Sequence, residues 1–290
     1  MNVLLTGSHG LLGEALTRAL HERGHTVQNL QRETIWASTQ QQLIEALSGF
    51  SLLIHAAANT DVEQCEKQPQ ACYRDNLLMT ELLASASGAQ SLRMVFASST
   101  GIYGTAKREP YFEFEAVHPT THHHRSKYLA EQEVLRHNPR NLIIRTGWLF
   151  GGRADNPKNF VARRIEELQH ASRSGQPVVS NAEQFGSPSS CDDVAMRLLE
   201  LAEQGRTGVY NCVNTGQASR HAYVHEIGRL ANIDVVVTPG SASGFHRVAQ
   251  VSFNEAAHNW KMNALGLPPM PDWQEALAKT VQRLLPEQVT

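Results

Sequence analysis

The feature that most constrains the fold is a glycine pattern close to the N-terminus. Gly7, Gly10 and Gly13 have the spacing Gly-x-x-Gly-x-x-Gly and directly follow the apolar run 2–6. Apolar residues then recur at three- and four-residue spacing, which predicts a helix that ends near Gly24. A strand, a glycine turn and a helix in this order are typical of the first unit of a dinucleotide-binding fold, whereas the glycines alone would indicate only a tight turn.

Each glycine has a separate physical role in such a turn. Gly7 permits the tight turn, Gly10 lets the backbone approach a pyrophosphate, and Gly13 lets helix and strand pack closely. The predicted helix, whose apolar pattern begins at Leu12, has unpaired N–H groups and a partial positive charge at its first turn, and both favour a phosphate; Leu11 beside it is a further candidate cofactor residue. We therefore predict that these residues bind a dinucleotide.

Strand and helix patterns alternate through the first half of the chain. Strands are predicted at 2–6, 25–30, 52–57, 94–97 and 142–144, and further helices at 40–47, 71–86 and 126–135. Strands that are apolar on both faces belong to parallel sheets covered by helices. The sequence therefore predicts an α/β fold with a doubly wound parallel sheet, the Rossmann fold.

The alternation ends after Gly151, where residues 152–157 have the composition of a loop. We therefore place a dinucleotide-binding domain at 1–151 and a smaller C-terminal α/β substrate lobe at 152–290. The boundary stays open, because the part at about 190–215 could return to the first sheet. Beyond the boundary the patterns predict helices at 160–171, 191–202 and 273–285 and a strand at 208–212.

The composition excludes several classes of protein. The 290 residues are 41% hydrophobic, which is typical of a globular chain with a large core. Lys and Arg number 26 against 28 Asp and Glu, too balanced for a protein that binds nucleic acid through its phosphates. The four cysteines form no Cys-x-x-Cys pair, and no apolar run approaches the ~20 residues of a membrane span. We expect a cytoplasmic protein that acts on a small molecule, with no nucleic-acid or membrane partner.

The end of the second predicted strand bears on the choice between NAD and NADP. NAD-preferring sites usually place an acid there, where this chain has Gln31 followed by Arg32. Arg32 could pair with the 2′-phosphate of NADP, or it could be a solvated loop residue. The prediction favours NADP and leaves NAD open.

Several short segments carry a family resemblance. In chain order they are 7–13, 55–60, 75–76, 98–104, 145–151, 184–188 and 271–273. Along nearly its whole length the chain resembles the extended short-chain dehydrogenases/reductases and, within that group, the dTDP-4-dehydrorhamnose reductases. The resemblance implies an NAD(P)H-dependent reductase of a keto group on a nucleotide-linked deoxysugar or a related small molecule. It also implies that Ala56, Ala57 and Ala58 border the cofactor, and a homodimer is compatible with it.

The resemblance implies three catalytic positions, which are a serine or threonine, a tyrosine, and a lysine four residues after the tyrosine. The matching residues are Ser99, His123 and Lys127, so a histidine stands where the family has tyrosine. A second Tyr-x-x-x-Lys pattern, from Tyr103 to Lys107, directly follows the strand that carries Ser99, and no helix pattern follows it. We therefore set that second pattern aside.

The histidine changes the proton chemistry of such a site. In the family, the tyrosine gives a proton to the alkoxide that hydride transfer creates, and the lysine lowers the pKa of the tyrosine and holds the nicotinamide ribose. Imidazole, with an ordinary pKa of about 6.5, can also act as an acid, although Lys127 nearby disfavours its protonated form. His123 is therefore either the acid or a catalytically silent residue, unless His122 or His124 is the true match.

Two other chemistries are weighed and set aside. The histidine run 122–124 suggests a metal, but adjacent histidines point in different directions and no second ligand group has zinc-like spacing, so we predict no metal site. A hydrolase would place its serine in a Gly-x-Ser-x-Gly turn, which Ser99 lacks.

Trp148, Gln184 and Arg247 are the candidate substrate residues. Trp148 could stack on a sugar or base, and Arg247 could hold a diphosphate. The alternatives are a buried core tryptophan, a capping glutamine and a surface arginine. The Arg-Pro of the family is replaced by Arg247-Val248, which weakens the link to the same nucleotide-sugar.

Three functions remain after this comparison. The first is a keto-sugar reductase that favours NADP. The second is a cofactor-binding regulatory subunit without turnover, as in the similar beta subunit of methionine adenosyltransferase. The third is a sugar epimerase or dehydratase. Retained Ser99 and Lys127 favour an enzyme, whereas the missing tyrosine and the missing Arg-Pro favour the subunit.

Overall fold

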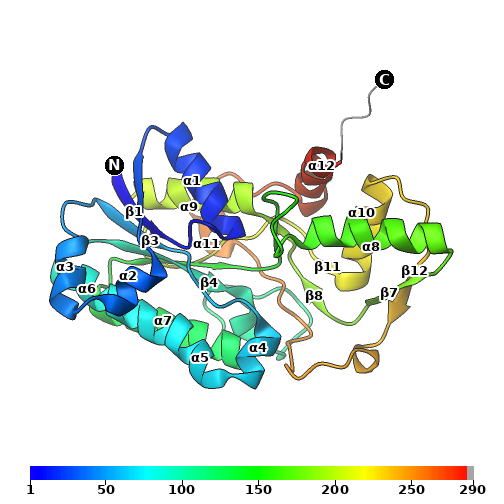
Figure 1. The fold of residues 1–290 in the computed structure, drawn as a ribbon, viewed down its shortest axis with the longest axis horizontal. Coiled ribbons are helices and arrows are strands. Elements are labelled where there is room, and N and C mark those ends of the chain that lie inside the picture. Colours follow the sequence, from blue (N-terminus) through cyan, green and yellow to red (C-terminus); the bar gives the residue numbers. More distant parts are fainter. Residues whose placement is uncertain (286–290) are drawn as a thin grey trace.

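A six-stranded parallel sheet forms the centre of the larger lobe (Figure 1). The computed structural model describes residues 1–285. The sheet strands are β1 (Asn2–Thr6), β2 (Thr26–Asn29), β3 (Leu52–His55), β4 (Met94–Ser99), β5 (Leu142–Thr146) and β10 (Gly208–Asn211). Their order is β10-β5-β4-β3-β1-β2, and every neighbouring pair is parallel. The strand order switches direction at β1, because β2 lies on one side of it and the later strands are added on the other side, starting with β3. Doubly wound sheets bind ligands at such a switch point. The predicted fold class is confirmed.

Successive residues of the central strands are buried on opposite faces of the sheet. In β1, Val3 and Leu5 belong to one apolar cluster, whereas Leu4 belongs to another. The same alternation divides Ile54 from Leu53 in β3. Burial on both faces explains why the strands have no polar alternation, and removing these apolar side chains from water stabilises the two-sided sheet.

Helices cover both faces. The first cluster joins the sheet to α1 (Leu11–Glu22) and α9 (Cys191–Glu203). The second joins it to α2 (Arg32–Ala37), α3 (Gln40–Ala46), α6 (Met79–Ala89) and α7 (His122–His137). The shorter helices α4 (Val62–Lys67) and α5 (Pro69–Tyr73) lie against α7, and a π-helical turn, Arg74–Leu78, leads into α6. A 3-10 turn, Thr100–Tyr103, follows β4.

The smaller lobe is built on α8 (Phe160–Ser174), α10 (Arg220–Leu230) and α12 (Trp273–Leu284), which share a third apolar cluster. Three short strand pairs accompany them: β6 (Leu149–Phe150) with β9 (Ser189–Ser190), β7 (Val178–Asn181) with β12 (Val237–Gly240), and β8 (Phe185–Gly186) with β11 (Ala218–Ser219). A 3-10 turn, Ala242–Gly244, and helix α11 (Trp260–Ala264) lie between β12 and α12. Because α9 packs on α1 and β10 pairs with β5, this part of the chain returns to the first sheet.

Several element boundaries differ from the sequence expectation, and the largest differences are in two helices. Helix α7 begins at His122, four residues before the predicted start at 126, because Thr121 caps it by accepting the N–H of His124. The predicted helix 71–86 is in fact α5, the π-helical turn and α6 in succession. The earlier start of α7 brings the whole histidine run into regular helix, so its three side chains point in fixed and different directions.

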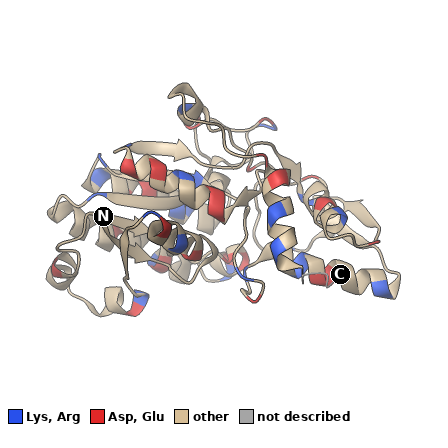
Figure 2. Cartoon of the chain, turned by 90° about the horizontal axis from the view of Figure 1, so that it is seen from above, with Lys and Arg blue, Asp and Glu red and all other residues tan. Residues whose placement is uncertain are grey.

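Charged residues of both signs are spread over the two lobes (Figure 2). This distribution agrees with the nearly balanced count of acidic and basic residues. Within residues 1–285, none of the helices combines the length and apolar character that a membrane crossing requires.

Candidate active site

The glycine turn is packed so tightly that two of its residues admit no side chain. Gly7 has a positive φ of 77°, and a Cβ there would lie 2.6 Å from the backbone nitrogen of Ala57. A Cβ on Gly13 would clash with the carbonyl oxygen of Gly7. A Cβ on Gly10 would come no closer than 3.3 Å to that same oxygen, so packing within the chain does not demand glycine there. This arrangement fits a turn in which Gly10 faces a ligand.

The first turn of α1 has donors to offer such a ligand. Gly10 precedes the helix and caps it with no side chain, and in the described part of the chain the N–H groups of Leu11, Leu12 and Gly13 find no acceptor. The side chain of Leu11 lies against Gly152, at the start of the loop that follows β6. Free N–H groups and the positive end of a helix fit a pyrophosphate.

The segment after β3 borders this turn. Ala56, Ala57 and Ala58 are half-buried, and the Ala57 N–H donates to Thr6 Oγ1 over 3.4 Å. His55 lies beneath them, with its two ring nitrogens 2.6 Å from Thr6 Oγ1 and 3.0 Å from Thr80 Oγ1. Burial, together with the charge of Lys127, lowers the pKa of His55 to about 3. His55 is thus a neutral structural residue that ties β3 to β1.

Arg32 begins α2 at the carboxyl end of β2, on the same edge of the sheet as the glycine turn. Its side chain is 49% exposed, and its Nη2 lies 3.4 Å from Asp75 Oδ2. Asp75 is buried and also accepts a hydrogen bond from Arg74 Nε at 2.9 Å. The Arg32 guanidinium is therefore held near this edge by a carboxylate while its donors remain open to solvent.

The three predicted catalytic residues come from two elements that pack against each other. Ser99 is the last residue of β4, and its Oγ accepts the N–H of Gly101 at 3.1 Å. His123 and Lys127 are one turn apart on α7, and both are buried. Lys127 Nζ lies 4.0 Å from the centre of the Phe96 ring in β4. The structure thus brings these residues to the carboxyl ends of β3 and β4.

His123 is held in one tautomer. Its Nδ1 lies 2.9 Å from the carbonyl oxygen of Asn59, just after β3. Since a carbonyl only accepts, Nδ1 carries the proton and Nε2 of the neutral ring is an acceptor. Burial lowers the pKa of His123 well below its ordinary value, and the charges of His124 and Lys127 lower it further.

Lys127 is the second titratable group of the site. Burial lowers its pKa to about 7, while the nearby carboxylate of Glu131 opposes this shift. No acceptor for its Nζ is present in residues 1–285. An ammonium group that is buried, unpaired and close to titration fits a site that binds a polar ligand.

The other two histidines of the run point elsewhere. His122 is turned toward α4 and α5, where its Nδ1 lies 3.3 Å from the Tyr73 hydroxyl. His124 Nδ1 lies 3.1 Å from Thr121 Oγ1, and its ring fills the space above Gly101, where any Cβ would clash with it. Of the three rings, only that of His123 contacts the segment after β3.

The second Tyr-x-x-x-Lys pattern lies in a structural network. Tyr103 is fully buried, donates to Asn211 Oδ1 at 2.7 Å and accepts from Arg145 Nη1 at 3.0 Å. Burial raises the pKa of Tyr103 to about 12. Lys107 is paired with Glu115 at 2.7 Å. A phenol with both its donor and its acceptor engaged in this way has no free proton for a substrate.

Trp148 and Gln184 lie together at the junction with the smaller lobe. Trp148 has a positive φ of 47°, and its Nε1 donates to Glu255 Oε2 at 3.0 Å. One face of the ring is covered by the guanidinium of Arg220, with Cζ 3.4 Å from the ring centre. The carbonyl oxygen of Gln184 accepts the N–H of Arg220 at 3.0 Å. Any ligand that stacked on Trp148 would therefore meet Arg220 on that face.

Arg247 lies further out. Its side chain is 48% exposed, and its Nε is 3.7 Å from Glu63 Oε1 on α4. The neighbouring N–H of Val248 also donates to Glu63, at 3.0 Å. The loop that carries Arg247 thus crosses from the smaller lobe to α4 of the larger one.

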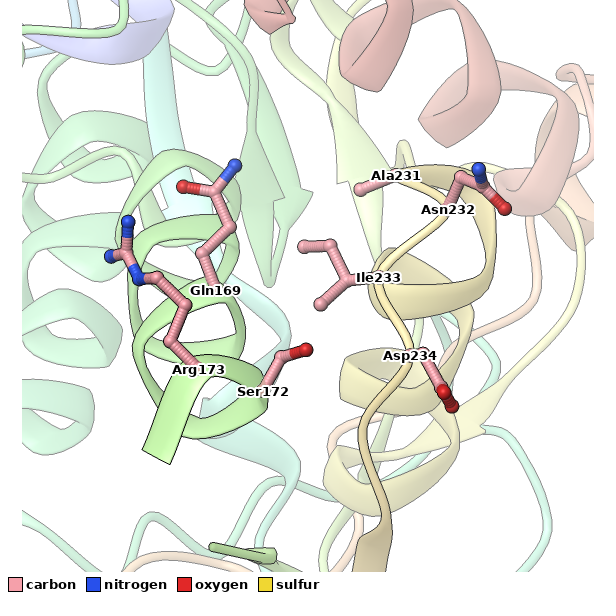
Figure 3. A pocket seen from close by; sticks show the side chains of 7 residues that line it. All are labelled: Gln169, Ser172, Arg173, Ala231, Asn232, Ile233 and Asp234. Carbon is pink, nitrogen blue, oxygen red and sulfur yellow. The ribbon is translucent and has the colours of Figure 1, made fainter. Parts of the chain in front are cut away.

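A shallow hollow in the smaller lobe lies apart from all of these residues (Figure 3). It is bordered by α8 and by the segment that follows α10, with Arg173 on one side and Asp234 on the other. None of the predicted site residues lines it. We assign no role to this hollow, because the chemistry-bearing side chains gather at the edge of the sheet.

Comparison with known proteins decides the family. The family model described as RmlD substrate binding domain matches residues 1–285. The chain belongs to the RmlD substrate binding domain family. The resemblance inferred from the sequence motifs is thereby confirmed.

Named members of the RmlD family align over almost the full length. The dTDP-4-dehydrorhamnose reductase of Mycobacterium tuberculosis H37Rv is 30% identical over 95% of this chain and 91% of its own. A Clostridium acetobutylicum enzyme of that name has a TM-score of 0.90 at 26% identity, covering 98% of this chain and 99% of its own. The Bacillus anthracis enzyme, solved in complex with NADP, has a TM-score of 0.89 at 26% identity and covers 98% and 100%.

Several residues of the site were not among the sequence candidates. Asn59 and Asn76, which surround His123, lie in segments that carried the family resemblance, so the motifs pointed to them indirectly. Arg220 and Glu255 had no such signal, because they lie in no recognised motif and reach Trp148 only through the fold.

Proposed function

We propose that this chain is an NADPH-dependent reductase of a keto group on a nucleotide-linked deoxysugar, with dTDP-4-dehydrorhamnose as the first substrate to test. The observation that carries the proposal is the gathering of the open glycine turn and the Ser99, His123 and Lys127 set at one edge of the sheet. The relatives named as dTDP-4-dehydrorhamnose reductases support it.

The residues present fit the cofactor. Gly7, Gly10 and Gly13, with the N–H groups at Leu11, would hold the pyrophosphate, and the residues 56–58 would border the nucleotide. Arg32 would pair with the 2′-phosphate of NADP, and Lys127 would hold the nicotinamide ribose. When bound, NADPH supplies the hydride for the carbonyl carbon.

Ser99 would orient the substrate carbonyl. Its Oγ already accepts the Gly101 N–H, which leaves the hydroxyl proton free to donate to a carbonyl oxygen. As hydride reaches the carbon, negative charge develops on that oxygen, and a donor placed there stabilises the transition state.

His123 would deliver the proton from Nε2. The neutral ring has its proton on Nδ1, so it must first take up a second proton from solvent at Nε2, one for each turnover. Burial opposes that charge, whereas the alkoxide forming beside the ring favours it. The imidazolium then gives its Nε2 proton to the substrate oxygen, and the ring returns to the tautomer that Asn59 holds.

A cofactor-binding protein without turnover is the second candidate. The tautomer of His123 favours it, since a ring with its proton on the Asn59 side has no proton for a substrate in its resting state. The two candidates share the cofactor and differ in the reaction, so they are separated by measuring both.

The test is a titration with NADPH followed by turnover. The native protein should bind NADPH saturably, and Gly10→Glu should not, because its carboxylate would occupy the pyrophosphate path. The native protein should also oxidise NADPH when dTDP-4-dehydrorhamnose is added, and Lys127→Met should not. Binding without oxidation of NADPH by any keto-sugar would favour the second candidate, and absence of binding would refute both.

A further inference from the structure

Arg220 is a cation with no acceptor for its side chain. It is the first residue of α10 and half-buried, and none of the residues from 1 to 285 accepts a hydrogen bond from its guanidinium or forms an ion pair with it. Burial lowers its pKa to about 10, which leaves it charged at neutral pH. Because the side chain is only half-buried and its nitrogens are not among the fully buried unpaired atoms, its N–H groups are open to solvent and can meet a ligand.

One opposite charge and two like charges act on Arg220. The carboxylate of Glu255 attracts it but forms no ion pair with it among the described residues, and it also accepts the Trp148 Nε1–H. Arg164 and Arg247 act on it as like charges. The hydroxyl of Tyr223 is also buried without a partner among the described residues. Donors therefore outnumber acceptors around Arg220, and an anion with several oxygens would satisfy them.

The stack on Trp148 leaves the donors of Arg220 free. The guanidinium lies over the ring with Cζ 3.4 Å from its centre, and Phe160 lies 5.4 Å away. A stacked guanidinium uses its face, whereas its N–H groups lie in its plane and point past the ring. Trp148 is itself fixed by its hydrogen bond to Glu255. The ring is thus a rigid support that presents the edge of Arg220.

This support is close to the predicted catalytic residues. Gly147, which precedes Trp148, contacts the Thr100 side chain so tightly that a Cβ would clash with its Oγ1. Thr100 directly follows Ser99. A substrate whose keto group lies at Ser99 would reach Arg220 by extending past Trp148, and the part of a nucleotide-sugar next to the sugar is its diphosphate.

We propose that Arg220, stacked on Trp148, binds a phosphate group of the diphosphate of the nucleotide-sugar. The proposal rests on the proposed function for the identity of the substrate. The fork of N–H donors matches a phosphate in a bidentate arrangement, which a lysine cannot reproduce. Arg220 is thereby a specificity residue, because it distinguishes a diphosphate-linked sugar from a free one.

The test compares binding of dTDP and of thymidine by calorimetry, without cofactor. The native protein should bind dTDP more tightly than thymidine. Arg220→Met should lose about ten- to hundredfold in dTDP affinity, the usual value of a charged hydrogen-bond pair, and Arg220→Lys should fall between. Arg229→Met is the matched control, because Arg229 lies on the same helix, is exposed and pairs with Glu226.

Turnover and cofactor binding separate the two proposals. Arg220→Met should raise KM for the nucleotide-sugar by a similar factor, with kcat nearly unchanged and NADPH affinity at the native value. If Arg220→Met does not bind NADPH, the variant is misfolded. The role of Arg220 is then tested by the dTDP affinity and the KM of Arg220→Lys. If Arg220→Met has the same KM and the same dTDP affinity as Arg229→Met, the role of Arg220 is refuted, whereas the proposed reductase activity is not. Arg220-dependent dTDP binding without any reduction would support the site and refute the reductase.

Discussion

Replacing His123 by tyrosine should change the pH dependence of reduction as well as its rate. Under the proposed mechanism the proton donor is the imidazolium form of His123, whose pKa lies well below 6.5 because the ring is buried beside Lys127. A tyrosine at the same position would stay protonated across the neutral range, since the ordinary pKa of a phenol is about 10. The native rate should therefore fall as pH rises because His123 loses its proton, whereas the tyrosine of the variant keeps its proton over this range.

The expected slope follows from the protonated fraction. With a pKa of at most about 6.5, no more than about one tenth of His123 is protonated at pH 7.5. The protonated fraction then falls about tenfold for each further pH unit. Lys127, with a pKa of about 7, loses its own proton over the same range in both proteins. Log kcat/KM above pH 7.5 should therefore fall about one unit more steeply per pH unit in the native protein than in His123→Tyr.

The assay follows the absorbance of NADPH with a keto-sugar substrate across this pH range. His123→Ala should lose about 10²- to 10⁴-fold in turnover near pH 6.5, the usual contribution of a general acid, and should keep its NADPH affinity. His122→Ala is the matched control, because the His122 ring is turned toward Tyr73 and away from the site. Equal slopes for native protein and His123→Tyr, or full activity of His123→Ala, would refute the assignment of His123 as the acid.

Three further predictions concern the cofactor and the fold. Arg32→Ala should remove a preference for NADPH over NADH of about ten- to hundredfold, measured as the ratio of the two dissociation constants, and equal native affinities would show that Arg32 is only a surface residue. Gly13→Ala should destabilise the fold by about 1–3 kcal/mol in urea unfolding, because its Cβ meets the Gly7 carbonyl oxygen, and a native midpoint would contradict this contact. His55 binds its proton more weakly in the fold, with a pKa of about 3, so stability should fall as pH drops below 6.5, by about 3 kcal/mol at pH 4. His55→Asn should lack this loss, and an unchanged pH dependence in the variant would contradict the assignment.

The sheet was largely predictable because its physical signal is local. The run Leu52–Ile54, for example, is apolar at every position, since each residue is buried on one face or the other. The glycine turn was predictable for the same reason, because the spacing of Gly7, Gly10 and Gly13 reflects contacts within a single strand–turn–helix unit. Parallel strands then place their carboxyl ends at one edge, which brings Ser99 toward that turn.

The remaining features depend on contacts between distant parts of the chain. Nothing in the sequence near His123 indicates that the Asn59 carbonyl, 64 residues away, fixes its tautomer. The stack of Arg220 on Trp148 joins residues that lie far apart in the sequence, and no residue pattern encodes the positive φ of Trp148. The early start of α7 was missed because a run of histidines shows no apolar period, although Thr121 caps the helix there.

The central claim is that this chain transfers a hydride to the keto carbon of a nucleotide-sugar. The most direct measurement uses NADPH that carries deuterium at its transferable position, incubated with dTDP-4-dehydrorhamnose and the native protein, and then determines the mass of the sugar product. We predict that the product carries one deuterium on the former carbonyl carbon and that Lys127→Met forms none of it. A deuterated cofactor that stays bound and unconsumed, with no label in the sugar, would contradict the account.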